Sequence, residues 1–138
     1  MNTSRWHQQN QDLGLLFLRV SSSAFLLGVH GLPKLLDYKT QLQTIEDPFH
    51  IGANVTLMLA IFAEVLCPVL IIVGLFVRLA CLPILSVLWI ALLIVHPQWS
   101  IEEGQFAWLL LILFTSVLIA GPGQIAFNVR FFGDSPHA

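Results

Sequence analysis

Four long apolar segments follow one another along the chain, with polar residues gathered between them. They run from about Leu13 to Leu36, Ala53 to Val77, Leu79 to Val95 and Phe106 to Ala120. A helix needs roughly 20 apolar residues to cross a bilayer, so each segment is at or near spanning length and the fourth is the shortest. None shows the alternation of a transmembrane strand. We predict four membrane-spanning helices, at about 13–36, 53–77, 79–96 and 104–121.

Composition supports lipid as the solvent for these helices. Hydrophobic residues make up 57% of the 138 residues, charged residues make up 10%, and the mean hydropathy is +0.81. A soluble domain is about 25% charged, so the polar residues are too few to cover four apolar helices in water. The length allows one domain, over residues 1–138. The predicted fold class is all-α, an integral membrane four-helix bundle in contact with the lipid bilayer.

The distribution of charge excludes one class of protein and predicts an orientation. A net charge of −2 excludes a basic nucleic-acid binder. With four spans, both termini and the second connection share one side, which carries Arg5, Arg78 and Arg130, while Lys34 and Lys39 belong to the other side. Because Lys and Arg are enriched in cytoplasmic loops, we predict that both termini are cytoplasmic.

Polar residues within the first segment form a narrow stripe. At 100° per residue, they fall within a sector of about 60°, which indicates that this face meets protein or a water-filled cavity rather than lipid. The members of the stripe are Asp12, Arg19, Ser23, His30, Lys34 and Asp37.

The second segment carries Glu64, four residues before Pro68. Proline removes one helical hydrogen bond and clashes with the carbonyl four residues earlier, so we expect a kink beside this carboxylate. Counting about 1.5 Å per residue places four side chains in the outer half of the bundle, where they could converge. These candidate ligand-binding residues are His30, Lys34, Glu64 and His96. Arg19 lies deeper, and its side chain is long enough to reach toward Glu64.

Several of these residues stand in motifs that resemble the DoxX family of small four-helix membrane proteins. The motifs, in order, are Leu18-Arg19, His30-Gly31-Leu32-Pro33-Lys34-Leu35, Ala63-Glu64, Gly74-Leu75-Phe76-Val77-Arg78-Leu79-Ala80, His96 and Gly121-Pro122-Gly123. The resemblance runs from Leu13 to Asn128 and is carried by their order and spacing. It implies a bacterial inner-membrane protein linked to sulfur and quinone oxidoreductases or to thiol-oxidant defence. It also implies an acidic residue near Gln105, for which Glu102 or Glu103 would have to substitute.

Three interpretations of the residues near Glu64 stay open. In the first, Glu64 forms a structural lock of ion pairs and hydrogen bonds with His30 and Lys34, which holds the first two helices together. In the second, the group binds the head of a quinone or a small sulfur or thiol compound, with His30 as donor and Glu64 as proton relay. In the third, His30, His96 and Glu64 hold a metal ion, although no ligand motif supports this and we predict none.

Three functions follow from these interpretations. The protein is a membrane subunit of an oxidoreductase system that serves a soluble redox partner, a conduit for a small solute, or a non-catalytic anchor. Cys67 and Cys81 form no CxxC pair, and we expect them to pack in the core. Nucleotide-binding and haem-attachment motifs are absent from the sequence, so redox chemistry would need a bound cofactor, such as quinone, or a partner. Catalytic residues are not identified, and the oligomeric state, including a homo-oligomer, is left open.

Overall fold

The computed structural model describes residues 3–127, and every regular element within this range is a helix. Seven stretches are α-helical and three are π-helical, with one residue more per hydrogen-bonded turn. In chain order the elements are α1 (Thr3–Leu26), η1 (Leu27–Gly31), α2 (Leu32–Leu36), α3 (Tyr38–Thr44), α4 (Ala53–Ile61), η2 (Phe62–Leu66), α5 (Cys67–Val73), α6 (Val77–Ile90), η3 (Ala91–Val95) and α7 (Gln105–Ala120).

These elements join into four rods. Helix 1 consists of α1, η1 and α2, helix 2 of α4, η2 and α5, and helix 3 of α6 and η3. Three are long and apolar enough to cross a membrane, with candidate spans of 33, 21 and 19 residues, while the apolar α7 has 16 residues. The all-helical membrane fold and the short fourth segment are therefore as the sequence predicts.

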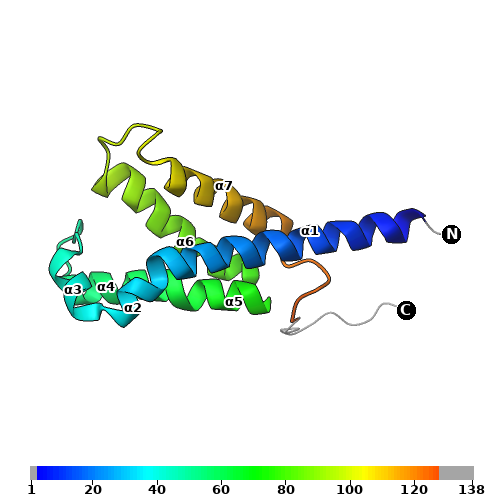
Figure 1. The fold of residues 1–138 in the computed structure, drawn as a ribbon, viewed down its shortest axis with the longest axis horizontal. Helices are drawn as coiled ribbons and strands as arrows, with labels where there is room; N and C mark the ends of the chain where they lie inside the picture. Colours follow the sequence, from blue (N-terminus) through cyan, green and yellow to red (C-terminus); the bar gives the residue numbers. More distant parts are fainter. Residues whose placement is uncertain (1–2, 128–138) are drawn as a thin grey trace.

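Helix boundaries differ from the sequence prediction in three places. Helix 1 begins at Thr3 rather than near Leu13, and its polar first turns project beyond the bundle (Figure 1). The polar connection between helices 1 and 2 contains a short helix, α3. Helix 2 ends at Val73 and helix 3 begins at Val77, so Arg78 lies inside a helix.

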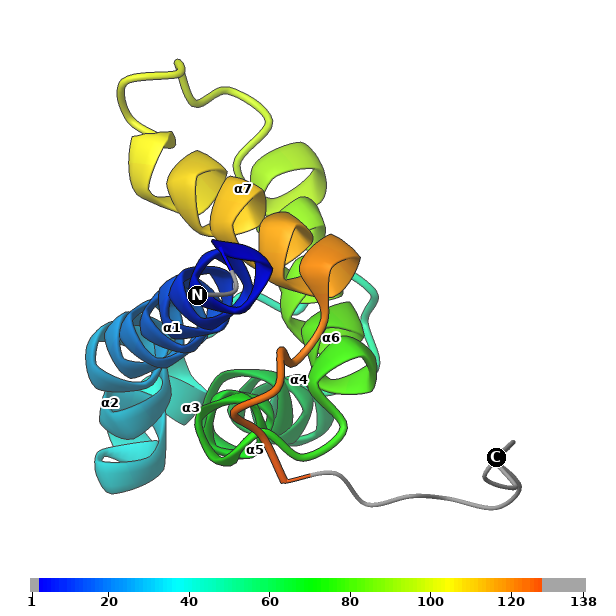
Figure 2. The ribbon, with the colours of Figure 1, turned by 90° about the vertical axis from the view of Figure 1, so that its right-hand side faces the viewer.

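The four rods form a ring in which each packs on its neighbours. Helix 1 packs on α5 and on α7, and α6 packs on both of these partners (Figure 2). Residues 121–127 and the start of α1 lie at the same end of the bundle (Figure 1), which we call the terminal end. The opposite end holds α3 and the connections 45–52 and 96–104, and we call it the loop end. Asn128 and Arg130 lie outside the described residues.

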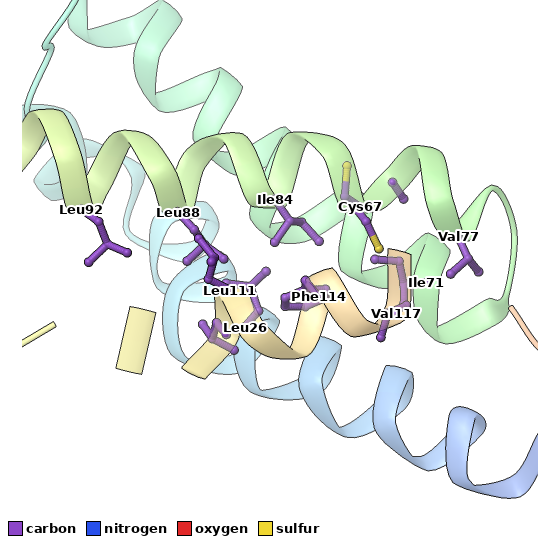
Figure 3. Close-up of a cluster of buried hydrophobic side chains, with 13 residues drawn as sticks. Leu26, Cys67, Ile71, Val77, Ile84, Leu88, Leu92, Leu111, Phe114 and Val117 are labelled. Carbon is purple, nitrogen blue, oxygen red and sulfur yellow. The ribbon is translucent and has the colours of Figure 1, made fainter. Parts of the chain in front are cut away.

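Apolar side chains fill the centre of the ring (Figure 3). Phe114 of α7 and Ile71 of α5 are completely buried, and Leu26 of α1 is 2% exposed. Cys67 and Cys81 are free thiols in this same cluster, which agrees with a packing role. Close packing of this kind fixes the relative positions of the helices and so holds the polar residues of the loop end in place.

Each π-helical segment stands just before a proline. The segments end at Gly31, Leu66 and Val95, and a proline follows two residues later each time, at Pro33, Pro68 and Pro97. Proline has no N–H to donate, so the register of helical hydrogen bonds changes easily there. The irregularity expected beside Glu64 is thus a π-helical turn that contains Glu64 itself.

Candidate functional site

A cavity of about 580 Å³ lies at the loop end, between helices 1, 2, 3 and α7. Most of its lining side chains are apolar. All three π-helical segments contribute to the wall, through His30 of η1, Glu64 of η2, and Ala91 and Val95 of η3. Single π-helical turns frequently occur at functional sites, because the extra residue displaces side chains from the regular helical pattern. We call this space the loop-end cavity.

An ion pair crosses the wall of the loop-end cavity. Lys34 Nζ lies 2.5 Å from Glu64 Oε2, and the two side chains are only 18% and 8% exposed. The same Nζ is 3.5 Å from the carbonyl oxygen of His30, one turn earlier. Glu64 is the twelfth residue of helix 2, about 16 Å from its loop-end start, whereas Lys34 is two residues from the loop-end terminus of helix 1, so the lysine reaches inward to the carboxylate. A paired charge at this depth holds helices 1 and 2 together and gives the cavity a polar point.

Two pairs of rings also line the loop-end cavity. The ring of His30 packs against Phe106 of α7, with centroids 5.5 Å apart. The ring nitrogens of His30 make no hydrogen bond to any residue within the described range, so they can serve a ligand. His96 stacks on Trp99 at 3.8 Å with nearly parallel planes, and both residues line the cavity.

Glu103 is a cavity residue that sequence reasoning named only as a substitute for an acidic residue. It lines the cavity, and its Oε2 accepts a hydrogen bond of 2.8 Å from the backbone N–H of Ser100. Glu102 is exposed and does not line the cavity, so of the two glutamates only Glu103 faces it. Glu46, Thr56 and Phe106 are not among the candidates from the sequence. Glu46 lies in a connection whose path has no helical pattern, whereas Thr56 and Phe106 lie in helices but carry no charge that would single them out.

The connection before helix 2 is fixed by one carboxylate. Asp47 Oδ1 accepts a hydrogen bond of 2.8 Å from the Thr56 hydroxyl, and Oδ2 accepts one of 2.8 Å from the N–H of Gly52. These bonds tie the connection to the first turn of α4 and hold the segment that carries Phe49 and Ile51 over the cavity. The loop side of the cavity is therefore covered by an ordered connection.

Arg19 is placed away from the other four candidates. Its Nη1 donates a 3.1 Å hydrogen bond to the carbonyl of Ile71, and its Nη2 donates to the carbonyl of Ile125. It lines a separate cavity of about 460 Å³ at the terminal end, which shares no lining residue with the loop-end cavity. The guanidinium caps the C-terminal end of α5, where the helix dipole favours a cation, and fastens the segment after α7.

The loop-end cavity thus brings together His30, Lys34, Glu64 and His96, and leaves out Arg19. Among the described residues, no group of three or more His, Cys, Asp and Glu side chains is arranged to hold a metal ion. The titratable side chains that line the cavity can form hydrogen bonds and transfer protons within a largely apolar space. Such a site suits a molecule with an apolar body and one polar, hydrogen-bond-accepting head.

Comparison with known proteins identifies the family. The family model described as DoxX matches residues 14–97, which contain the span of helix 1 after its first turns, helices 2 and 3, and all four candidates of the loop-end cavity. The match stops before α7. Neither the curated proteins nor the solved structures give a match. Since the matched region is more than half of the chain, this protein belongs to the DoxX family.

Proposed function

We propose that the protein is the membrane subunit of an oxidoreductase system, and that the loop-end cavity binds the head of a quinone. The observation that carries this proposal is the buried Lys34–Glu64 pair in the wall of a largely apolar space of about 580 Å³. A quinone needs apolar walls for its ring and a donor for each carbonyl oxygen that it uses. Lys34 and His30 are donors on this wall, and Phe106 supplies an aromatic face.

The residues of the pair have complementary tasks in this proposal. Reduction of a quinone to a quinol takes two electrons and two protons. The electrons come from a soluble redox partner, because this chain has no recognisable redox motif of its own. His30 or Lys34 donates a proton to the reduced oxygen, and Glu64, hydrogen-bonded to Lys34, passes on the replacement proton. A small sulfur or thiol compound, the other ligand class that the resemblance suggests, would use the same donors.

We place the protein in the bacterial inner membrane with cytoplasmic termini, which directs the loop end outward. The excess of Arg at the terminal end supports this orientation. A solute conduit is less well supported, because the two cavities share no lining residue and Arg19 is bonded between helices. A non-catalytic anchor, in which Lys34 and Glu64 only lock two helices, makes different predictions for mutants and is tested together with quinone binding.

The first experiment measures binding of a decyl-substituted benzoquinone to the purified protein in lipid nanodiscs. Glu64→Gln removes the charge that orients Lys34 and keeps the shape of the side chain. We expect the dissociation constant for the quinone to rise about tenfold, because the hydrogen bond from the charged Lys34 to the quinone is weakened. Glu102→Gln is the matched control, because Glu102 is exposed outside the cavity. Equal affinity in wild type and Glu64→Gln would contradict the proposal.

A second experiment separates the ligand site from the structural lock. Lys34→Met alone leaves Glu64 as an unpaired charge, which we expect to lower the free energy of unfolding by about 3 kcal/mol. In the double variant Lys34→Met/Glu64→Leu neither charge remains, so much of the stability should return. A ligand site predicts that this restored protein still fails to bind quinone. Full binding by the double variant would leave the pair as a lock only.

A further inference from the structure

Three sides of the loop-end cavity are closed by contacts between neighbouring helices. Helix 1 meets helix 2 at the ion pair between Lys34 and Glu64. Helix 1 meets α7 where the ring of His30 packs on Phe106. Helix 3 meets α7 through α6, where the ring of Trp89 packs edge-on against Trp108. A ligand cannot leave the cavity between any of these pairs without breaking a contact that is present in the structure.

The fourth side, between helices 2 and 3, is open. Nearer the terminal end, α5 and η2 pack against α6. Toward the loop end the helices diverge (Figure 1), and within the described part of the chain α4 makes no extensive packing contact with either α6 or η3. The cavity reaches this gap. Thr56 lines it nearest the loop end, with its hydroxyl bonded to Asp47, and the lining residues that frame the gap below Thr56 are apolar. They are Leu59 and Ala60 on helix 2, and Val87, Ile90 and Ala91 on helix 3.

The frame of this gap lies at the depth of lipid chains. Ala91 is four residues from the loop-end terminus of helix 3, or about 6 Å, and Leu59 is six residues from the start of helix 2, or about 9 Å. Both depths fall within one half of a hydrocarbon core that is about 30 Å thick. Leu59 is 55% exposed, although it lines the cavity. The gap therefore faces acyl chains rather than water.

We propose that this gap, framed by Leu59, Ala60, Val87, Ile90 and Ala91, is a lateral portal. The ligand enters the cavity sideways from the bilayer, its polar head lies at Lys34 and Glu64, and its single apolar chain stays in the portal and extends into the lipid. This inference rests on the proposed quinone site and narrows the ligand to lipid-soluble molecules with one long apolar chain. Phe49 and Ile51 cover the cavity on the side of the loops, so the apolar chain of the ligand leaves the cavity through the portal.

The test compares two ligands that share one head. One is the decyl-substituted benzoquinone, and the other is the same benzoquinone without the chain. Ala91→Trp fills the portal with an indole ring, and Ala60→Trp does so from the opposite helix, as a second variant if the first folds poorly. Leu93→Trp is the matched control, because Leu93 is exposed on η3 and does not line the cavity. Thermal unfolding in nanodiscs verifies that each variant is folded.

We expect a portal variant to weaken binding of the decyl compound about tenfold, the usual scale of an overpacked apolar contact, and to leave binding of the chain-free compound unchanged. The control should bind both compounds as wild type does. If folded portal variants bind both compounds normally, the lateral portal is wrong and the quinone site stands. If wild type binds neither compound, the quinone site is wrong, and the portal inference fails with it.

Discussion

The Cα atom of Gly31 faces the carbonyl oxygen of Glu64, so closely that a Cβ built on Gly31 would lie 2.0 Å from that oxygen. This carbonyl stands four residues before Pro68, which has no N–H to pair with it in a regular helix. A glycine hydrogen fits against the oxygen and offers a weak C–H···O contact. Helices 1 and 2 thus touch backbone to backbone beside the Lys34–Glu64 ion pair.

A side chain at position 31 should therefore force the two helices apart. We expect Gly31→Ala to lower the free energy of unfolding by about 2–3 kcal/mol, on the scale of overpacked cores, and to weaken quinone binding because Lys34 moves relative to Glu64. Gly28→Ala is the matched control in the same π-helical segment, since nothing lies within 4 Å of a Cβ there. Equal unfolding temperatures for the two variants would contradict this contact.

Arg19 should matter for the terminal end of the bundle. Its guanidinium serves the carbonyls of Ile71 and Ile125, and Gly74, with φ of 91°, leaves room for it. Arg19→Met removes both hydrogen bonds while keeping an apolar stem, so we expect a loss of about 2–3 kcal/mol in unfolding free energy. Limited proteolysis should also cut the segment after α7 faster. An unchanged cleavage rate would show that Arg19 does not fasten this segment.

Asp47 should make the connection before helix 2 sensitive to acid. The hydrogen bond from the Thr56 hydroxyl is the main cause that lowers the pKa of Asp47 from its ordinary value of 3.8. The N–H groups of Gly52 and Ile51 and the charge of His50 lower it further, against desolvation, which raises it. Because the pKa is lower in the folded protein, the carboxylate stabilises the connection above its ordinary pKa. That contribution is lost as the pH falls through the lowered pKa.

Amide hydrogen exchange at Ile51 and Gly52 can measure this effect. We expect protection of these amides to be constant near neutral pH and to fall as Asp47 takes up its proton. Asp47→Asn should show weak protection at neutral pH and no further acid-dependent loss. Glu46→Gln is the control, because the neighbouring carboxylate makes none of these bonds. Loss of protection in the control would assign the acid sensitivity to another group.

The orientation in the membrane can be tested with introduced thiols. Cys67 and Cys81 are 1% and 0% exposed, so we expect them not to react with a membrane-impermeant maleimide. With cytoplasmic termini, Lys39→Cys at the loop end is labelled in intact cells and Gln8→Cys on the projecting part of α1 is not. Opening the membrane should expose Gln8→Cys. The opposite labelling pattern would reverse the orientation and direct the loop end to the cytoplasm.

The meeting of His30, Lys34, Glu64 and His96 could be predicted from the sequence for a simple reason. Depth in a membrane follows from counting residues along nearly straight helices, and ionisable groups in the membrane must face away from lipid. The same counting predicts which segments cross the bilayer. Neither estimate requires knowledge of side-chain contacts. In the structure the four candidates line one cavity.

The remaining features depend on contacts that leave no local pattern. Arg19 shares a stripe with His30 when every residue turns the helix by 100°, but His30 lies inside the π-helical η1 and the partners of Arg19 are backbone carbonyls, which any residue carries. The polar first turns of α1 and the helix α3 lack an apolar face that would predict them. Pro68 predicts an irregular helix beside Glu64, but a proline alone does not distinguish a kink from a π-helical turn.

The π-helical turn of helix 1 also separates that helix into two parts with different constraints. One additional residue in a turn rotates everything after it by about 100° about the helix axis. The face of α1 that packs on α5 and α7 therefore does not dictate which residues of α2 point into the cavity. Substitutions near Lys34 can change what the cavity accepts while the packing around Phe114 stays the same. Ligand preference and membrane anchoring can accordingly diverge independently on one continuous helix.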